Sequence, residues 1–261
     1  MDIVKQIIDQ RITKILQDNP ELFSDKKDEE RKRSQAFLLL GVAAYLDIDI
    51  AEAIQYTTDG GQDGGFDAAY IEDTQDSQIN VVLFQSKYSR KLDSDSNFPA
   101  NAVEKAVNTV KCVFDPNANI QLNYKSKKKV DEIRSFILDG RIPYVTFVML
   151  NNGIAWNNDG QNYINNAFNG QEQVKFVHFS HTDIINYINR STPINTHINF
   201  SGKAIQEDFN YKRVILGRVS VSEIYKLMDE YGDRLLEKNI RRYLGRNIIN
   251  EQISSTLLSK D

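Results

Sequence analysis

A glycine-rich turn in the first third of the chain leads an acidic residue onto an apolar run. The turn spans residues 58–65, and Asp67 follows it, while a second apolar run at 81–84 leads to Gln85 and Lys87. Residues two apart in a strand point to the same face and lie about 7 Å apart, so Gln85 and Lys87 share a face. If the two runs pair as neighbouring strands, Asp67 joins them at one edge of the sheet. An oxygen-rich metal site with a cation beside it is suited to phosphodiester cleavage.

Each half of this pattern has a plainer explanation when it is taken alone. Glycine and aspartate are common in turns because both tolerate unusual backbone angles, and a Gln-x-Lys sequence at a strand end is usual on a solvated face. Their order along one strand-turn-strand unit favours a shared site. Asp59 and Asp63 compete with Asp67 for the acidic position, but both lie within the turn, whereas Asp67 follows Phe66 directly onto the predicted strand. The four-residue spacing of the three aspartates is not that of a calcium-binding loop.

These residues resemble a known group of nucleases. Asp67 followed by the Gln-x-Lys sequence at 85–87 resembles the Asp…Gln-x-Lys variant of the PD-(D/E)xK nuclease superfamily. The glycine-rich sequence of residues 60–67 is similar to that of restriction enzymes of the Mrr type, and more similar still to that of the abortive-infection phage-resistance (AIPR) proteins. The resemblance implies a restriction-endonuclease-like fold, a mixed α/β sheet flanked by helices.

A second resemblance lies near the end of the chain. Residues 231–245 and 250–257 resemble the start of the region specific to AIPR proteins, so the two resemblances span most of the chain from about Asp49. The family alone implies a role in bacterial abortive infection against phage, in the cytoplasm. AIPR proteins generally continue well past this pattern, which leaves open whether the chain is a fragment of a longer protein.

The resemblance implies roles for individual residues. Asp67 and Gln85 are expected to bind Mg²⁺ or Mn²⁺, with the amide oxygen of Gln85 replacing the acid that is usual in the superfamily. The backbone carbonyl of Ser86 is implied as a further ligand. Lys87 is expected to orient the attacking water or to stabilise charge that develops on the phosphate. Related nucleases often add a glutamate from the helix before the strands, and Glu52 fits that position, although a solvated helix residue explains it nearly as well.

Basic residues near the predicted site could contact phosphates. Arg90 and Lys91 follow the Gln-x-Lys sequence, and Tyr88 beside them could stack on a base. Two further clusters, at 125–129 and 241–246, are explained better as solvated helix faces. His178 and His181 have a spacing that could bind metal, but one falls in a predicted strand and the other in the following turn, so we interpret them as ordinary histidines.

Strands alternate with helices along the chain, which predicts an α/β layered domain. We expect N-terminal helices at 1–46 that pack on the core, a nuclease domain at 47–200, and the start of the AIPR-specific region at 201–261, with a small helical appendage. Periodicity is lost between residues 191 and 210. Helices are predicted at 2–16, 28–45, 49–53, 100–114, 125–138, 182–188 and 223–243, with another after 151, and strands at 54–57, 66–71, 79–87, 144–150, 174–179 and 214–221.

The composition is that of an ordinary globular protein, with 261 residues, 41% hydrophobic and 26% charged. No apolar run is long enough to span a bilayer and the N-terminus lacks the form of a signal peptide, so we expect no membrane partner and a reducing cytoplasm. The single cysteine, Cys112, excludes an internal disulfide and a cysteine zinc site. The net charge of −4 disfavours a protein coated in basic residues, so local clusters must supply any phosphate contacts.

The leading hypothesis is a metal-dependent nuclease that hydrolyses phosphodiester bonds in DNA, with RNA less favoured. The alternative is a catalytically weak or inactive module that keeps a nuclease fold and binds or senses nucleic acid, since the usual second metal-binding acid is missing. A third hypothesis, an unrelated α/β interaction domain, leaves the glycine-rich turn and Lys87 unexplained. Strand form, base preference, activating trigger and any homo-oligomeric state stay open.

Overall fold

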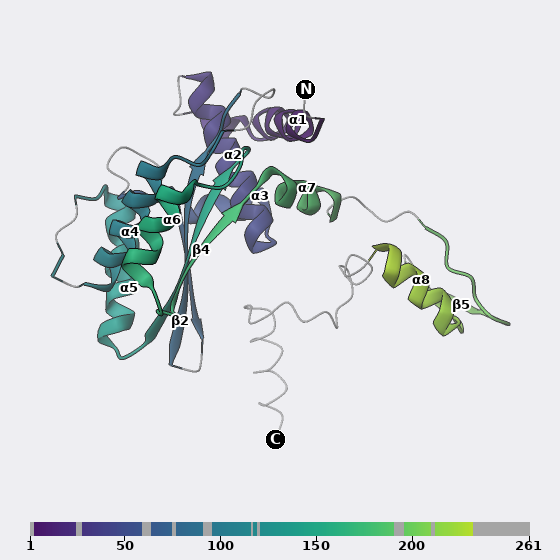
Figure 1. The fold of residues 1–261 in the computed structure, drawn as a ribbon. Helices are drawn as coiled ribbons and strands as arrows, with labels where there is room; N and C mark the ends of the chain where they lie inside the picture. Colours follow the sequence, from purple (N-terminus) through teal and green to yellow (C-terminus); the bar gives the residue numbers. More distant parts are fainter. Residues whose placement is uncertain are drawn as a thin grey trace. The chain divides into compact units, whose positions relative to one another are not determined.

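Apolar runs separated by turns and helices form a four-stranded mixed sheet in this computed structural model (Figure 1). The strand order is β1-β2-β3-β4, in which β1 is antiparallel to β2, and β2, β3 and β4 are parallel. A hairpin joins β1 to β2, whereas helices cross between the parallel strands, as parallel pairing requires. The strands are β1 (Ala68–Thr74), β2 (Gln78–Lys87), β3 (Ile142–Asn151) and β4 (Val174–Phe179).

The structure describes residues 3–231 apart from 25–27, 59–63, 75–76, 91–95, 116, 119–120, 191–195 and 210–211. The chain divides into two units, Met1–Asn189 and Arg190–Asp261. The second unit contains a hairpin of β5 (Ile205–Phe209) and β6 (Lys212–Leu216), followed by helix α8 (Val221–Tyr231). Within the described ranges, no helix is both long and apolar enough to cross a bilayer.

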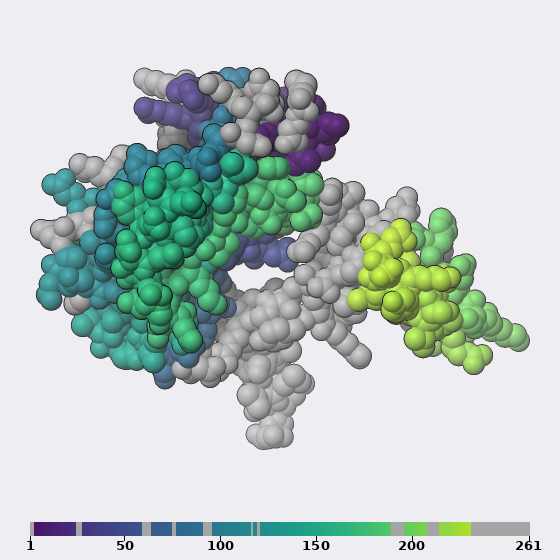
Figure 2. Space-filling model, in the orientation of Figure 1, coloured from purple at the N-terminus to yellow at the C-terminus, as the bar shows by residue number. Residues whose placement is uncertain are grey.

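Helices cover both faces of the sheet because both faces are apolar. Ile79, Val81 and Leu83 of β2 alternate onto one face, which α4, α5 and α6 cover. Phe84 lies on the other face, where α1, α2 and α7 pack. In Figure 2 the side chains of α4 to α6 fill the space between the ribbons of Figure 1. The helices are α1 (Ile3–Asp18), α2 (Glu29–Leu46), α3 (Ile50–Ala53), α4 (Ala100–Phe114), α5 (Tyr124–Leu138), α6 (Asn158–Phe168) and α7 (His181–Arg190), with short 3₁₀ turns at Pro20–Phe23 and Ile54–Tyr56.

The α/β class and most of the predicted elements are confirmed, but the strand predicted at 54–57 is wrong. That segment is the 3₁₀ turn Ile54–Tyr56, and the Thr57 hydroxyl donates to the carbonyl of Ile54 at 2.8 Å, which closes the turn. Thr57 forms only a single bridge to Ala68. Strand β5 lies where the sequence lost its periodicity, and the predicted helix 223–243 is described only as far as Tyr231.

The backbone of α2 lies directly on the sheet at Gly41. A Cβ atom at this position would lie 2.1 Å from Cδ2 and 2.7 Å from Cδ1 of Leu150, a fully buried residue of β3. Such distances are too short for carbon atoms, so a residue without a side chain is needed at this crossing.

We expect Gly41→Ala to lower the free energy of unfolding, measured in urea, by about 1 kcal/mol or more. Overpacking a core costs about 1–3 kcal/mol, whereas alanine gains about 1 kcal/mol over glycine in a helix. Leu150→Ala removes the clash, and in that background Gly41→Ala should be neutral or stabilising. A Gly41→Ala variant more stable than the parent would place α2 farther from the sheet.

Candidate active site at the carboxyl end of the sheet

Asp67 lies just before β1 and is held against the end of β2 by two hydrogen bonds. The β1–β2 ladder begins with the pair Ala68–Phe84, and the amide of Asp67 also donates to the carbonyl of Phe84, at 2.6 Å. Oδ2 of Asp67 then accepts from the backbone amide of Ser86 at 2.7 Å. The carboxylate is therefore fixed against the backbone that carries the Gln-x-Lys sequence.

The two ends of the glycine-rich turn are tied together by Thr58. Its amide donates to the carbonyl of Asp67 at 2.9 Å, and its hydroxyl donates to the carbonyl of Phe66 at 2.9 Å. Gly64 and Gly65 have φ of +74° and +93°, a backbone region that favours glycine. The role of Thr58 in closing the turn was not predicted from the sequence. The one feature there that could have indicated it is a hydroxyl residue at the first position of the turn. Asp59 and Asp63 lie outside the described residues.

Gln85 carries a buried amide oxygen with no hydrogen-bond partner in the described part of the chain. The residue is 4% exposed, and its Oε1 is the unsatisfied atom. Leaving a polar group buried without a partner costs about 1–3 kcal/mol. An oxygen held in this state beside a carboxylate is suited to ligating a hard cation.

Lys87 lies on the same sheet face as Gln85. The alternation that puts Val81 and Leu83 under α4 continues to Gln85 and Lys87, and the carboxylate of Asp67 bonds to the backbone amide of Ser86 between them. Lys87 itself is exposed at the end of β2. The structure thus places Gln85 and Lys87 on one face at the carboxyl end of the sheet and holds the Asp67 carboxylate at the backbone between them.

Glu52 lies with a different group of side chains. Its Oε1 accepts from the hydroxyl of Tyr56 at 3.4 Å, and the ring of Tyr56 packs edge-on against Tyr70 with centroids 5.2 Å apart. Tyr70 alternates to the sheet face opposite Ala69, the face away from Gln85. Glu52 therefore lies with side chains on the other face from Gln85 and Lys87.

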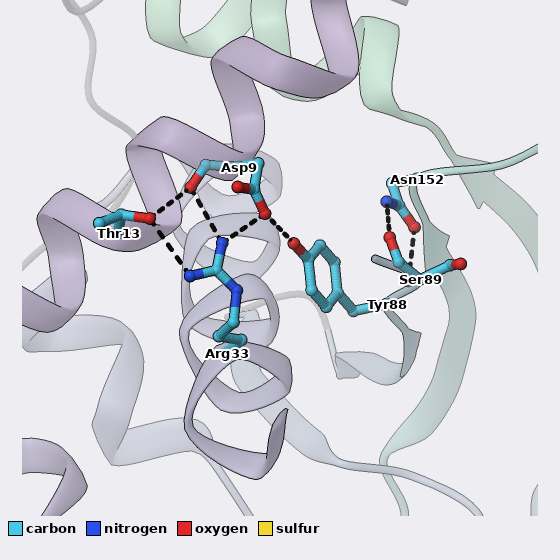
Figure 3. Close-up of polar contacts among 6 residues, drawn as sticks. All are labelled: Asp9, Thr13, Arg33, Tyr88, Ser89 and Asn152. Carbon is cyan, nitrogen blue, oxygen red and sulfur yellow. Dashed lines mark hydrogen bonds and ion pairs between the residues drawn. The ribbon is translucent and has the colours of Figure 1, made fainter. Parts of the chain in front are cut away.

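Tyr88 packs into the protein instead of presenting a ring for base stacking (Figure 3). Its hydroxyl donates to Oδ1 of Asp9, which also pairs with the guanidinium of Arg33. Its ring lies against Phe37, with centroids 5.2 Å apart. Burial, and then the hydrogen bond to Asp9, raises the pKa of Tyr88. The expected role of Tyr88 in stacking is thus replaced by an anchor between the end of β2 and helices α1 and α2.

Ser89 is fixed from the other side by Asn152, which follows β3. Asn152 accepts from the amide of Ser89 at 2.9 Å and donates to the carbonyl of Ser89 at 2.6 Å (Figure 3). Tyr88 and Ser89 together form a clamp on the chain directly after Lys87. Arg90 beyond it is exposed, and Lys91 lies outside the described residues.

His178 extends the polar face to β4. The parallel registers place Gln85, Met149 and His178 in one row across β2, β3 and β4. Nδ2 of Asn151 donates to the carbonyl of Ile154 at 3.1 Å, so its Oδ1 accepts from Nε2–H of His178 at 2.7 Å. Burial lowers the pKa of His178, and nearby His181 lowers it further, against the opposing charge of Asp183. The sequence spacing alone gave no sign that Asn151 would set the tautomer of this histidine.

Asp67 is the carboxylate of the candidate site among the described residues. Across the described ranges, no group of three or more histidine, cysteine, aspartate or glutamate side chains could hold a metal ion. Comparison of the chain with known protein families, curated proteins and solved structures found no match. The function of the site must therefore be inferred from its own chemistry.

The hydroxyl of Tyr88, one half of the clamp, should contribute to the stability of the fold. Tyr88→Phe keeps the ring on Phe37 but removes the hydrogen bond to Asp9, so the free energy of unfolding should fall by about 1.5 kcal/mol. Tyr124→Phe is the control, because Tyr124 is 84% exposed. It should change stability by less than about 0.5 kcal/mol. Equal effects of the two variants in urea unfolding would show that the Tyr88–Asp9 contact is not formed.

The lowered pKa of His178 gives the fold a pH dependence. Folded His178 stays neutral in a range where the unfolded chain is protonated, so its contribution to stability is complete above about pH 6.5 and is lost as pH falls below that value. We expect the Tm to fall more steeply between about pH 7.5 and 5 for the parent than for His178→Gln, which does not titrate. Identical slopes would contradict this placement of His178.

Proposed function

We propose that this chain is a metal-dependent nuclease that hydrolyses phosphodiester bonds in nucleic acid, with DNA as the expected substrate. The observation that carries the proposal is the buried Oε1 of Gln85, which has no partner among the described residues, next to Ser86, whose amide holds the Asp67 carboxylate, and with the exposed Lys87 two residues away. A residue kept only for folding gains nothing from an unsatisfied buried oxygen. The polar face also ends at the exposed Lys87, which a substrate can reach.

Asp67, Gln85 and the backbone carbonyl of Ser86 are the groups that would hold Mg²⁺ or Mn²⁺. They are hard oxygen donors, which suits both ions, and the free Oε1 of Gln85 fits a neutral ligand. With a single carboxylate among them, affinity for the ion should be weak until substrate phosphate adds its own oxygens. When bound, such an ion polarises a phosphoryl oxygen as a Lewis acid.

Lys87 supplies the positive charge that the protein itself brings to the reaction. An ammonium group near the scissile phosphate stabilises the negative charge that builds up on its oxygens, or orients the water that attacks it. The clamp at Tyr88 and Ser89 fixes the backbone from which Lys87 extends, while the side chain stays exposed to substrate. Asp67 is itself oriented by the amide of Ser86.

A wider role follows from the resemblance to AIPR proteins, namely anti-phage abortive infection in a bacterial cytoplasm. In that proposal residues 47–200 are the nuclease domain, supported by helices 1–46, and 201–261 begin the AIPR-specific region. The second resemblance lies at residues 231–245 and 250–257, and of these the structure describes Tyr231 alone. This role therefore depends on the sequence resemblance.

One observation favours a second candidate function. The site has Gln85 where a second acid is usual in the resembled superfamily, and the described residues contain no cluster of acidic ligands. A weakly active or inactive module that binds or senses nucleic acid would tolerate that change. The presence of both Asp67 and Lys87 at the same end of the sheet favours the active nuclease.

Two substitutions on the same face separate these functions. Lys87→Ala removes the cation and leaves the oxygen ligands, so the cleavage rate should fall about 100-fold or more while metal affinity is kept. Gln85→Glu adds a negative ligand of nearly the same shape, so metal should bind more tightly and cleavage should persist. Both are measured by metal titration and by cleavage of the same DNA and RNA substrates.

Lys175→Ala is the matched control, because Lys175 is exposed near the start of β4, at the other end of the sheet. It should cleave like the parent. If Lys87→Ala cleaves as fast as the parent, the catalytic assignment fails and the binding module becomes the better explanation.

A further inference from the structure

Helix α5 begins at a cap residue that bonds to Thr58, which is itself hydrogen-bonded to Asp67. Asn123 caps the helix, since its Oδ1 accepts from the amide of Ser126 at 2.9 Å, and its Nδ2 donates to the carbonyl of Thr58 at 3.0 Å. Thr58 in turn donates to the carbonyl of Asp67 at 2.9 Å. Leu122 packs so closely on Gly64 that a Cβ there would lie 2.2 Å from its Cδ2. The first turns of α5 are thus fixed at the end of the sheet that carries the site.

The outward side of these turns is basic and aromatic. Tyr124 is 84% exposed, and Lys125, Lys127 and Lys128 are exposed as well. Ser126 and Val130 face the core, so Tyr124, Lys127 and Lys128 share the outer face by helical spacing. Together, Tyr124, Lys125, Lys127 and Lys128 form what we term the α5 basic surface. Lys129, next to it, pairs with Glu132 at 3.0 Å.

This placement of charge is unfavourable for the helix itself. The first turn of α5 contains no acidic residue, although the N-terminal end of a helix dipole favours anions and disfavours cations. A nearly fully exposed tyrosine adds nothing to the core. Folding therefore explains neither feature, whereas a negatively charged ligand with flat, apolar groups explains both. Single-stranded nucleic acid has that chemistry, because phosphates can contact the lysines and an unstacked base can stack on the ring.

We propose that the α5 basic surface binds single-stranded nucleic acid and leads it to Asp67 and Lys87. This inference rests on the proposed nuclease function and adds the strand form of the substrate. A duplex keeps its bases stacked inside, so it can use the lysines but not Tyr124. The lysines should therefore contribute to binding of either form, and Tyr124 to binding of the single strand.

The test measures binding without cleavage, on the full chain in EDTA. The probe is a fluorescein-labelled oligothymidylate of about 20 nucleotides, followed by fluorescence anisotropy over a salt series. The first variant carries Lys125→Gln, Lys127→Gln and Lys128→Gln. Its matched control carries Lys14→Gln, Lys111→Gln and Lys175→Gln, three exposed lysines elsewhere in the same unit, so both variants change the net charge equally.

We expect the α5 variant to bind at least about tenfold more weakly than the parent. The slope of log affinity against log salt should become shallower by about 0.7 for each phosphate that the variant no longer neutralises. The control should bind within about twofold of the parent. Tyr124→Ala should weaken single-strand binding about fivefold or more, while Tyr124→Phe, which keeps the aromatic face, should bind like the parent. Tyr124→Ala should leave binding of the matching duplex unchanged.

Each contrary outcome has one meaning. If the α5 variant and its control weaken equally, only net charge matters and the α5 basic surface is not a site. If Tyr124→Ala affects duplex and single strand alike, the assignment of the strand form fails. If the parent binds and cleaves nucleic acid but the α5 variants bind unchanged, the inference fails and the nuclease function stands. If the parent neither binds nor cleaves any nucleic acid, the proposed function itself fails.

Discussion

Two hydrogen bonds at the start of β1 set the geometry on which the candidate site depends. The amide of Asp67 donates to Phe84, and the carboxylate of Asp67 accepts from the amide of Ser86. Together they hold the acid against the backbone of β2 next to Gln85. Because the side-chain period of a strand is two, a slip of β2 by one residue would move Gln85 and Lys87 to the other face of the sheet. The glycine-rich turn, Thr58 and the cap of α5 all support this register.

The rest of the site combines a rigid backbone with an exposed side chain. Tyr88 ties the end of β2 to α1 and α2, and Asn152 ties Ser89 to the end of β3. Lys87 lies immediately before this clamp and remains exposed. Gln85, two residues earlier, is buried, and its Oε1 has no hydrogen-bond partner within the described ranges. A fixed scaffold that presents one buried ligand and one accessible cation suits a reaction in which substrate completes the site.

Local sequence patterns predicted much of this arrangement, but they could not predict contacts between residues far apart in the sequence. The alternation of β2 placed Gln85 and Lys87 on one face, and helical periodicity predicted both ends of α4 correctly. The same local rules suggested that Tyr88 was free to stack on a base. No residue near it in the sequence indicates its contact with Asp9, which pairs with Arg33. The Asn151–His178 pair and the bond from Asn123 to Thr58 likewise arise only from packing. The strand predicted at 54–57 failed because Thr57 bonds back to Ile54.

The most direct test of the central claim, that Asp67 and Gln85 hold a divalent metal together with nucleic acid, is a Mn²⁺ titration followed by electron paramagnetic resonance. The parent should bind Mn²⁺ weakly alone and more tightly when an uncleaved nucleic acid is present, since its phosphate adds oxygen ligands. Asp67→Asn should lose binding in both conditions, with its thermal unfolding unchanged. Equal Mn²⁺ binding by the parent and a folded Asp67→Asn variant would contradict a metal site at Asp67.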